Sequence, residues 1–176
     1  MKFPNMLLSH FELYVQNITQ MESFYRDVLG FVVTDRGAGS EGMVFLSRSP
    51  EEHHQLVLNP RPDFRTQASP LDHISFRVAE LSDLRQFYRA LSEAGIDFDA
   101  VSHGTTWSLY FRDPENNRLE IFTDTPWYVH QPCKFKVDLS LSDEELYAHT
   151  EAEIKDMPGF SAASNWRKDH TSKMDT

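Results

Sequence analysis

Apolar and polar residues alternate in the same way in two separate segments of the chain. Residues 8–15 (LSHFELYV) and residues 71–78 (LDHISFRV) both begin with Leu-x-His and continue with an apolar residue at every second position. This period is typical of a strand with one buried face. The two segments lie 63 residues apart, which indicates an internal repeat.

A predicted helix follows the strand in each half of the repeat. The same offset aligns residues 24–26 with residues 87–89, both Phe-Tyr-Arg, inside amphipathic segments at about 20–29 and 81–94. The period of these segments predicts helices, and the glycine that follows each one suits a C-terminal cap. Both halves therefore continue from a strand into a helix.

Three strands are predicted after each helix. They lie at 31–35, 43–47, 53–58, 97–102, 105–112 and 117–122. One such module alone would expose its sheet edges, and pairing two modules completes a core. The expected fold class is α+β: two paired βαβββ modules form a half-open mixed barrel around a metal site, followed by a C-terminal extension with a helix.

The repeat also predicts the domain organisation. One domain spans residues 1–123, with its two modules at about 7–58 and 70–123. The C-terminal extension spans residues 124–176 and consists of a loop and a helix at about 142–156.

The extension begins with an irregular aromatic stretch that holds Trp127, Tyr128 and His130. We expect the extension to cover the cleft with these side chains near its mouth, to build a subunit interface, or only to pack over the sheet. Ser142 and the glutamate three residues later have the spacing of a capping box at the start of the predicted helix. The polar residues 164–176 (SNWRKDHTSKMDT) are expected to fray.

Strand alternation places the candidate functional side chains on one face. The apolar residues of each strand must pack beneath the helices, so the alternate residues point away from the core. Five polar side chains can then share one concave surface: His10, His53, His73, Tyr110 and Glu120. His54 falls on the core side. A single strand histidine or surface glutamate is usually only a satisfied polar residue, so the inference depends on their joint placement.

His10, His73 and Glu120 are the predicted metal ligands. Two neutral imidazoles and one carboxylate form the 2-His-1-carboxylate facial triad of non-haem Fe(II) oxygenases, which leaves positions open for other ligands. The set has no thiolate, which argues against a closed structural zinc site. The sequence leaves open whether Mn(II) or another divalent metal replaces Fe(II).

Composition limits the partners and the compartment. A formal net charge of −10 argues against nucleic acid and anionic membranes as partners, although a locally basic pocket can still admit a small anionic substrate. Cys133 is the only cysteine, so no internal disulfide can form. No apolar run approaches the ~20 residues of a membrane span, and the start lacks a signal-peptide pattern. We expect a cytoplasmic protein.

The paired modules with these ligands resemble the vicinal oxygen chelate superfamily, which includes glyoxalase I, bleomycin- and fosfomycin-resistance proteins and type I extradiol dioxygenases. The resemblance covers about residues 7–123. Residues 103–122 (HGTTWSLYFRDPENNRLEIF) are most similar to the catechol 2,3-dioxygenase type, in which His-Gly precedes a Tyr-Phe strand, an Asp-Pro turn and Asn-Arg-x-Glu. Many extradiol enzymes have two module pairs and this chain has one, so it resembles the one-domain members, which act as homodimers or larger homo-oligomers.

The resemblance implies an activity and a role for each residue. Fe(II) held by His10, His73 and Glu120 would serve the ring cleavage of a small aromatic diol by O₂. Tyr110 and His103 would bond the substrate oxygens, and His53 would act as the acid–base catalyst. The spacing from His103 to Tyr110 is shorter here than in that family.

Two other functions remain as alternatives. A glyoxalase-like, metal-dependent isomerase or lyase would need a fourth ligand, for which Gln55 is the candidate. It would have no use for His53, His103 and Tyr110 together, and this trio favours the dioxygenase. A non-catalytic small-molecule-binding member of the superfamily would need no metal triad.

Overall fold

A computed structural model describes residues 9–37, 42–49, 52, 54–61 and 72–174. The chain divides into two compact units, which are Met1–Pro70 with Asp113–Asn117, and Leu71–Arg112 with Arg118–Thr176. Each unit contains one copy of the predicted repeat, and each is described separately below.

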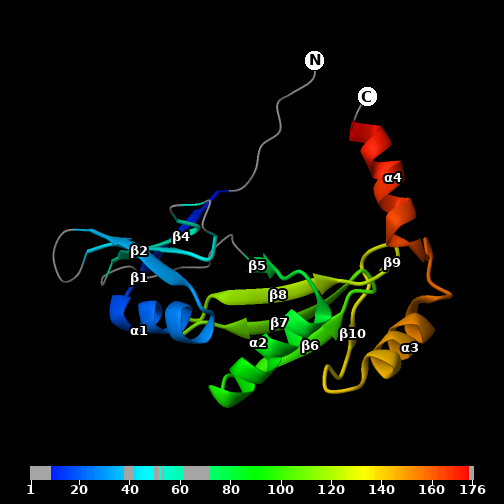
Figure 1. The fold of residues 1–176 in the computed structure, drawn as a ribbon, viewed down its shortest axis with the longest axis horizontal. Helices are drawn as coiled ribbons and strands as arrows, with labels where there is room; N and C mark the ends of the chain where they lie inside the picture. Colours follow the sequence, from blue (N-terminus) through cyan, green and yellow to red (C-terminus); the bar gives the residue numbers. More distant parts are fainter. Residues whose placement is uncertain (1–8, 38–41, 50–51, 53, 62–71, 175–176) are drawn as a thin grey trace. The chain divides into compact units, whose positions relative to one another are not determined.

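The first unit is a four-stranded mixed sheet with one helical segment. Its strands have the order β1-β4-β3-β2, with β1 parallel to β4 and the other pairs antiparallel. The elements are β1 (Phe11–Val15), α1 (Ile18–Ser23), the π-helical η1 (Phe24–Val28), β2 (Val32–Arg36), β3 (Val44–Ser47) and β4 (Leu56–Pro60). Figure 1 shows these elements in blue and cyan.

The helical segment of the first unit begins earlier and is less regular than predicted. Asn17 caps α1 by accepting a hydrogen bond from the backbone N–H of Gln20, three residues before the predicted start of the helix at about residue 20. After Ser23 the backbone widens into η1, where two adjacent aromatic residues, Phe24 and Tyr25, are both buried. The buried residues of this segment and of β3 and β4 form the core of the unit.

The turn Asp113–Asn117 belongs to the first unit. The buried carboxylate of Asp113 accepts hydrogen bonds from the Tyr25 hydroxyl at 3.2 Å and from the backbone and side chain of Asn117. Burial raises the pKa of Asp113, and these hydrogen bonds oppose the shift without cancelling it. Glu115 accepts from the backbone N–H groups of Gln16 and Asn17 at 2.6 Å, so the turn is joined to the start of α1.

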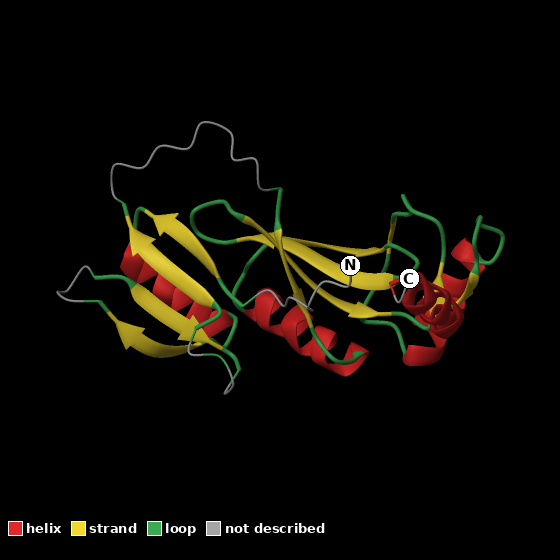
Figure 2. Cartoon of the chain, turned by 90° about the horizontal axis from the view of Figure 1, so that it is seen from above, coloured by secondary structure: helices red, strands yellow, loops and turns green. Residues whose placement is uncertain are grey.

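The second unit repeats the topology and adds a strand. Its sheet has the order β10-β6-β7-β8-β5, with β5 parallel to β8, as β1 is to β4. The elements are β5 (Ile74–Arg77), α2 (Leu81–Glu93), β6 (Phe98–Ser102), β7 (Thr106–Arg112), β8 (Arg118–Asp124) and β10 (Phe135–Lys136). In each unit the helix lies against one side of the strands (Figure 2). The α+β class and the βαβββ repeat are therefore confirmed, and neither described sheet closes on itself.

The C-terminal segment is more ordered than predicted. It contains β9 (Trp127–Tyr128), α3 (Asp143–Ile154), β11 (Ser161–Ala162) and α4 (Ala163–Met174). The capping box of Ser142 and Glu145 is present at the start of α3. The prediction that residues 164–176 fray was wrong for residues 164–174, which lie in α4; Trp166 of this helix stacks on Tyr128. In the described part of the chain, no helix combines the length and apolarity needed to cross a membrane.

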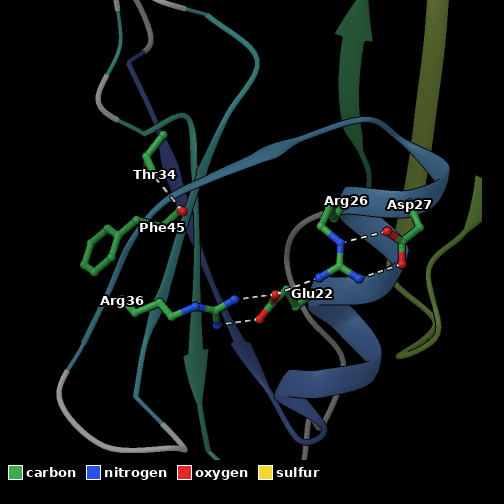
Figure 3. Close-up of polar contacts among 6 residues, drawn as sticks. All are labelled: Glu22, Arg26, Asp27, Thr34, Arg36 and Phe45. Carbon is green, nitrogen blue, oxygen red and sulfur yellow. Dashed lines mark hydrogen bonds and ion pairs between the residues drawn. The ribbon is translucent and has the colours of Figure 1, made fainter.

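The buried carboxylate of Glu22 forms ion pairs with two arginines in the first unit. The side chain of Glu22 is 11% exposed and accepts two hydrogen bonds from Arg36, at 2.6 and 2.7 Å, and one from Arg26 at 3.1 Å (Figure 3). Arg26 also pairs with Asp27. The hydrogen bonds from Arg36 outweigh burial and hold the pKa of Glu22 below its ordinary value.

We expect Glu22→Gln to lower the free energy of unfolding by about 1 kcal/mol at neutral pH, because the ion pair with Arg36 is lost. The effect is small because Arg36 is half exposed, and ion pairs with exposed side chains contribute little to stability. A lowered native pKa means that this contribution is present above the ordinary pKa of glutamate. It is lost as the pH falls through the lowered value. Urea denaturation of wild type and variant across the acid range measures the difference, with Asp27→Asn as the exposed control. A difference that does not shrink in acid would contradict this account.

Candidate metal and substrate site

Three polar side chains meet on one face of the second sheet. β5 and β8 place Ser75 opposite Glu120, and β7 places Tyr110 opposite Glu120 from the other side. Apolar neighbours on the same strands, such as Leu119 and Ile121, are buried on the opposite face. The strand alternation predicted from sequence is therefore confirmed in this unit.

Glu120 is the buried anion of this face. It is 7% exposed, and its Oε2 accepts a hydrogen bond from Ser75 at 2.5 Å. Burial alone would raise the pKa of Glu120. Hydrogen bonds from Ser75, Tyr110 and Ser108, together with the charge of His73, outweigh burial, so the pKa lies below its ordinary value. A carboxylate held ionised at low exposure is suited to bind a cation.

His73 faces the carboxylate. Its Nε2 lies 3.4 Å from Oε2 of Glu120, and its Nδ1 lies 2.6 Å from Oδ1 of Asp72. A hydrogen bond from Nδ1 to a carboxylate orients the ring and leaves Nε2 as the ligating atom, as in carboxylate–histidine–metal sites. Asp72 also accepts from Arg118 at 2.8 Å, and the hydrogen bond from His73 is the main reason that its pKa is lowered.

His103 and Tyr110 form a hydrogen-bonded pair beside Glu120. Nε2 of His103 lies 3.1 Å from the Tyr110 hydroxyl, and Nδ1 lies 2.8 Å from the backbone carbonyl of Cys133. Because a carbonyl only accepts, Nδ1 carries a hydrogen, and the Tyr110 hydroxyl is the hydrogen-bond partner of Nε2. The two residues are brought together as predicted.

Tyr110 is the centre of this group. Burial, followed by the hydrogen bond and negative charge of Glu120, raises the pKa of Tyr110. Its ring lies 5.6 Å from the ring of His73, centre to centre. Two cations lie over the ring, Arg118 at 4.4 Å and Lys134 at 5.5 Å from its centroid. Because burial and the charge of Glu120 outweigh the opposing charge of Arg118, the hydroxyl stays protonated and can donate a hydrogen bond.

The first unit holds the remaining predicted residues. His10 is exposed, and its ring lies 4.5 Å from the ring of His54. The expectation that His54 is on the core side was wrong: β4 begins at Leu56, so strand alternation does not extend back to His54, whose ring packs on His10 and Phe45. His53 lies outside the described residues.

Gln55 is engaged within the first unit. Its side-chain oxygen accepts from the backbone N–H of Arg48 at 3.0 Å and lies 3.5 Å from the hydroxyl of Ser47. These bonds join the ends of the connection between β3 and β4. A role as a fourth metal ligand would compete with them.

His73 and Glu120 fit a divalent metal. An imidazole nitrogen and an ionised carboxylate oxygen face each other, and a cation satisfies two such electron-pair donors at once. Among the described residues, no group of three or more His, Cys, Asp or Glu side chains is close enough to hold a metal alone. The pair would supply two of the three predicted ligands.

Strand alternation placed Ser75 with His73 and Ser108 with Tyr110, but sequence reasoning missed three residues of this face, namely Asp72, Cys133 and Lys134. The contribution of the C-terminal segment has a signal in the sequence, because residues 134–139 (KFKVDL) alternate polar and apolar as a strand does. Phe135 and Lys136 form β10 on the edge of β6. This pairing brings Cys133 and Lys134 to His103 and Tyr110.

One protein family matches the chain over most of the described strands. The family model described as Glyoxalase/Bleomycin resistance protein/Dioxygenase superfamily matches residues 7–121. This range contains the first βαβββ repeat, the second repeat except for the last three residues of β8, and the three predicted metal ligands.

Relatives of two kinds are similar to this chain. Biphenyl-2,3-diol 1,2-dioxygenase 3 of Rhodococcus globerulus is 39% identical over 124 residues, which are 66% of this chain and 63% of that protein. Metallothiol transferase FosB of Shouchella clausii is 31% identical over 126 residues, which are 67% of this chain and 80% of that protein. The chain thus matches less than two thirds of the length of the dioxygenase.

A solved structure has the same fold. The glyoxylase/bleomycin resistance protein/dioxygenase domain from Frankia sp. EAN1pec is 26% identical, with a TM-score of 0.60, and the match covers 69% of this chain and 94% of that one.

Proposed function

Because this chain belongs to the glyoxalase/bleomycin resistance protein/dioxygenase superfamily, we propose that it is a metal-dependent extradiol dioxygenase that cleaves a small aromatic diol with O₂. The observation that carries this proposal is the His103–Tyr110 pair, hydrogen-bonded at 3.1 Å beside Glu120. The similarity to a biphenyl-diol dioxygenase supports the same choice.

His10, His73 and Glu120 would hold the metal, Fe(II) in our proposal. A bound divalent metal of this kind supplies Lewis-acid activation of the diol hydroxyls and the redox chemistry with O₂. The contribution of the chain to ligand binding is pre-organisation. Asp72 orients the ring of His73 through Nδ1, and Ser75 holds Oε2 of Glu120.

Tyr110 and His103 would hold the substrate. The Tyr110 hydroxyl keeps its proton and so donates a hydrogen bond to an ionised diol oxygen. His103 has Nδ1 committed to the carbonyl of Cys133, so Nε2 is the atom that exchanges a proton with Tyr110 or with the substrate. We assign acid–base catalysis at the ring-cleavage step to His53, on the family resemblance of the sequence.

A glyoxalase-like isomerase or lyase is the second candidate. The similarity to metallothiol transferase FosB favours a reaction without O₂. The hydrogen bonds of Gln55 to the connection between β3 and β4 weigh against its use as the fourth ligand that this reaction would need. The dioxygenase therefore stays the leading proposal.

The test is O₂ uptake by the protein loaded anaerobically with Fe(II), with catechol, 3-methylcatechol and biphenyl-2,3-diol as substrates. We expect uptake accompanied by a new near-visible absorption band of a ring-opened product. Tyr110→Phe should lower kcat/KM about 10- to 100-fold because one hydrogen bond to the developing oxyanion is lost. Tyr128→Phe, the same change at a tyrosine that stacks on Trp166, is the control and should have no effect.

Two results would contradict the proposal. One is a metal-loaded, folded protein that consumes no O₂ with any of the diols. The other is equal activity in Tyr110→Phe and wild type. Metal-dependent conversion of a thiol adduct without O₂ would support the isomerase or lyase instead.

A further inference from the structure

Lys134 comes to the functional face through the pairing of β10 with β6. Phe135 lies opposite Ser102 in this antiparallel pair, so the residue before Phe135 comes level with the residue after Ser102, which is His103. The carbonyl of Cys133 bonds the ring of His103, and Nζ of Lys134 lies 5.5 Å from the centroid of the Tyr110 ring. An ammonium group therefore stands beside the two side chains proposed to hold the substrate.

The charge of Lys134 is not neutralised locally. Arg118, the other cation over the Tyr110 ring, pairs with Asp72 at 2.8 Å, and Arg77 on β5 pairs with Asp124 at 2.5 Å. Among the described residues, no carboxylate pairs with Lys134, whose side chain is exposed. Tyr110 thus has one compensated cation and one uncompensated cation next to it.

An uncompensated ammonium discriminates between ligands by their charge. A neutral substituent placed against the ammonium would displace its water without forming a new polar interaction. A carboxylate would replace that water with an ion pair. The chain as a whole has a net charge of −10 and repels anions at long range, so a local cation is needed for an anionic ligand to be preferred.

We propose that Lys134 is a specificity-determining residue that binds an anionic substituent of the ring, so that the substrate is an aromatic diol carrying a carboxylate. This inference rests on the proposed function and names the substrate class of the same site. The proposed substrate has two adjacent hydroxyls, which bind at the metal ligands and Tyr110. It also has one negatively charged group within reach of Nζ of Lys134.

The test compares ligands that differ in charge and little in size. The Fe(II)-loaded full chain is titrated without O₂ with 2,3- and 3,4-dihydroxybenzoate and with the corresponding methylcatechols. The dissociation constants are measured by intrinsic fluorescence, and kcat/KM is then measured with O₂. The variants are Lys134→Gln, Lys134→Arg and the control Lys136→Gln, an exposed lysine two residues away.

We expect wild type to bind at least one carboxylated diol more tightly than its methyl counterpart. Lys134→Gln should weaken binding of that carboxylated ligand about 3- to 5-fold and change binding of the methylcatechol less than about 2-fold. Lys134→Arg should keep most of the preference, and Lys136→Gln should leave it unchanged. Raising the salt concentration should reduce the preference in wild type.

Several outcomes overturn the inference. They are an unchanged ratio of the two dissociation constants in Lys134→Gln, an equal loss in Lys136→Gln, and an absence of binding by both kinds of diol. Failure of the proposed function is separate. If carboxylated diols bind in a manner that depends on Lys134 but no O₂ is consumed, the charge recognition stands and the ring-cleavage proposal falls.

Discussion

Glu120→Gln is expected to lower Fe(II)-dependent O₂ uptake at least about 100-fold. Changes in groups that only support metal ligands already cost about 10- to 100-fold, and a ligand should cost more. The amide has the shape of the carboxylate and can still accept the hydrogen bond from Ser75. It cannot carry the charge that hydrogen bonds and His73 stabilise in the carboxylate, so the metal-free variant should lose some free energy of unfolding at neutral pH.

Two measurements separate these effects. Anaerobic Fe(II) titration reports metal affinity, and urea denaturation with and without metal reports stability. A metal that binds only the native state raises the stability of wild type, and it should not raise that of Glu120→Gln. Glu93→Gln, at the exposed end of α2, is the matched control and should resemble wild type in both. Full metal-dependent stabilisation of Glu120→Gln would exclude Glu120 as a ligand.

Gly104→Ala is expected to lower the free energy of unfolding by about 2–4 kcal/mol. Gly104 has a φ of +73°, and an added Cβ would lie 2.5 Å from Cγ2 of Val129 and 3.3 Å from Cγ2 of Ile154. Left-handed backbone costs a residue with Cβ about 1–2 kcal/mol, and overpacking typically adds about 1–3 kcal/mol. Gly95→Ala is the control, because φ is +66° there and nothing lies within 4 Å of the added atom. It should cost about 1 kcal/mol.

The same variant should also lower activity. Val129, Cys133 and Ile154 form one buried cluster, and the carbonyl of Cys133 bonds Nδ1 of His103. Displacing this cluster would break the hydrogen bond between Nδ1 of His103 and the carbonyl of Cys133. This bond fixes the tautomer and the orientation of the ring. Urea denaturation and kcat/KM of both glycine variants test the account. Equal losses in Gly104→Ala and Gly95→Ala would mean that the contact with the C-terminal segment contributes nothing.

The repeat explains how much of the fold can be predicted from this sequence. The Leu-x-His strands, the Phe-Tyr-Arg triplets and the glycines were enough to predict two βαβββ modules, because each signal occurs twice in the same order. The start of β4 was placed three residues too early. Residues 54 and 55 are polar and lie outside the strand, and Gln55 bonds back to Arg48 instead of facing across a sheet.

The C-terminal segment shows why part of the site was missed. Cys133 acts through its backbone carbonyl, which every residue type has, so side-chain motifs cannot reveal it. Lys134 reaches the site because β10 pairs with the edge of β6. The alternation in residues 134–139 predicts a strand, but it does not predict which strand is its partner. The position of Glu120 and Tyr110 on one face was predictable because strand alternation within one sheet decides which side chains share a face.

Incorporation of oxygen is the most direct test of the central claim. The Fe(II)-loaded protein is mixed with a diol that it binds under ¹⁸O₂, and the ring-opened product is analysed by mass spectrometry. We predict one O₂ consumed per diol and a product whose carboxylate retains ¹⁸O, with no labelled product from Glu120→Gln. A converted substrate without ¹⁸O, formed equally well under nitrogen, would contradict the dioxygenase and leave the metal site to a reaction that does not use O₂.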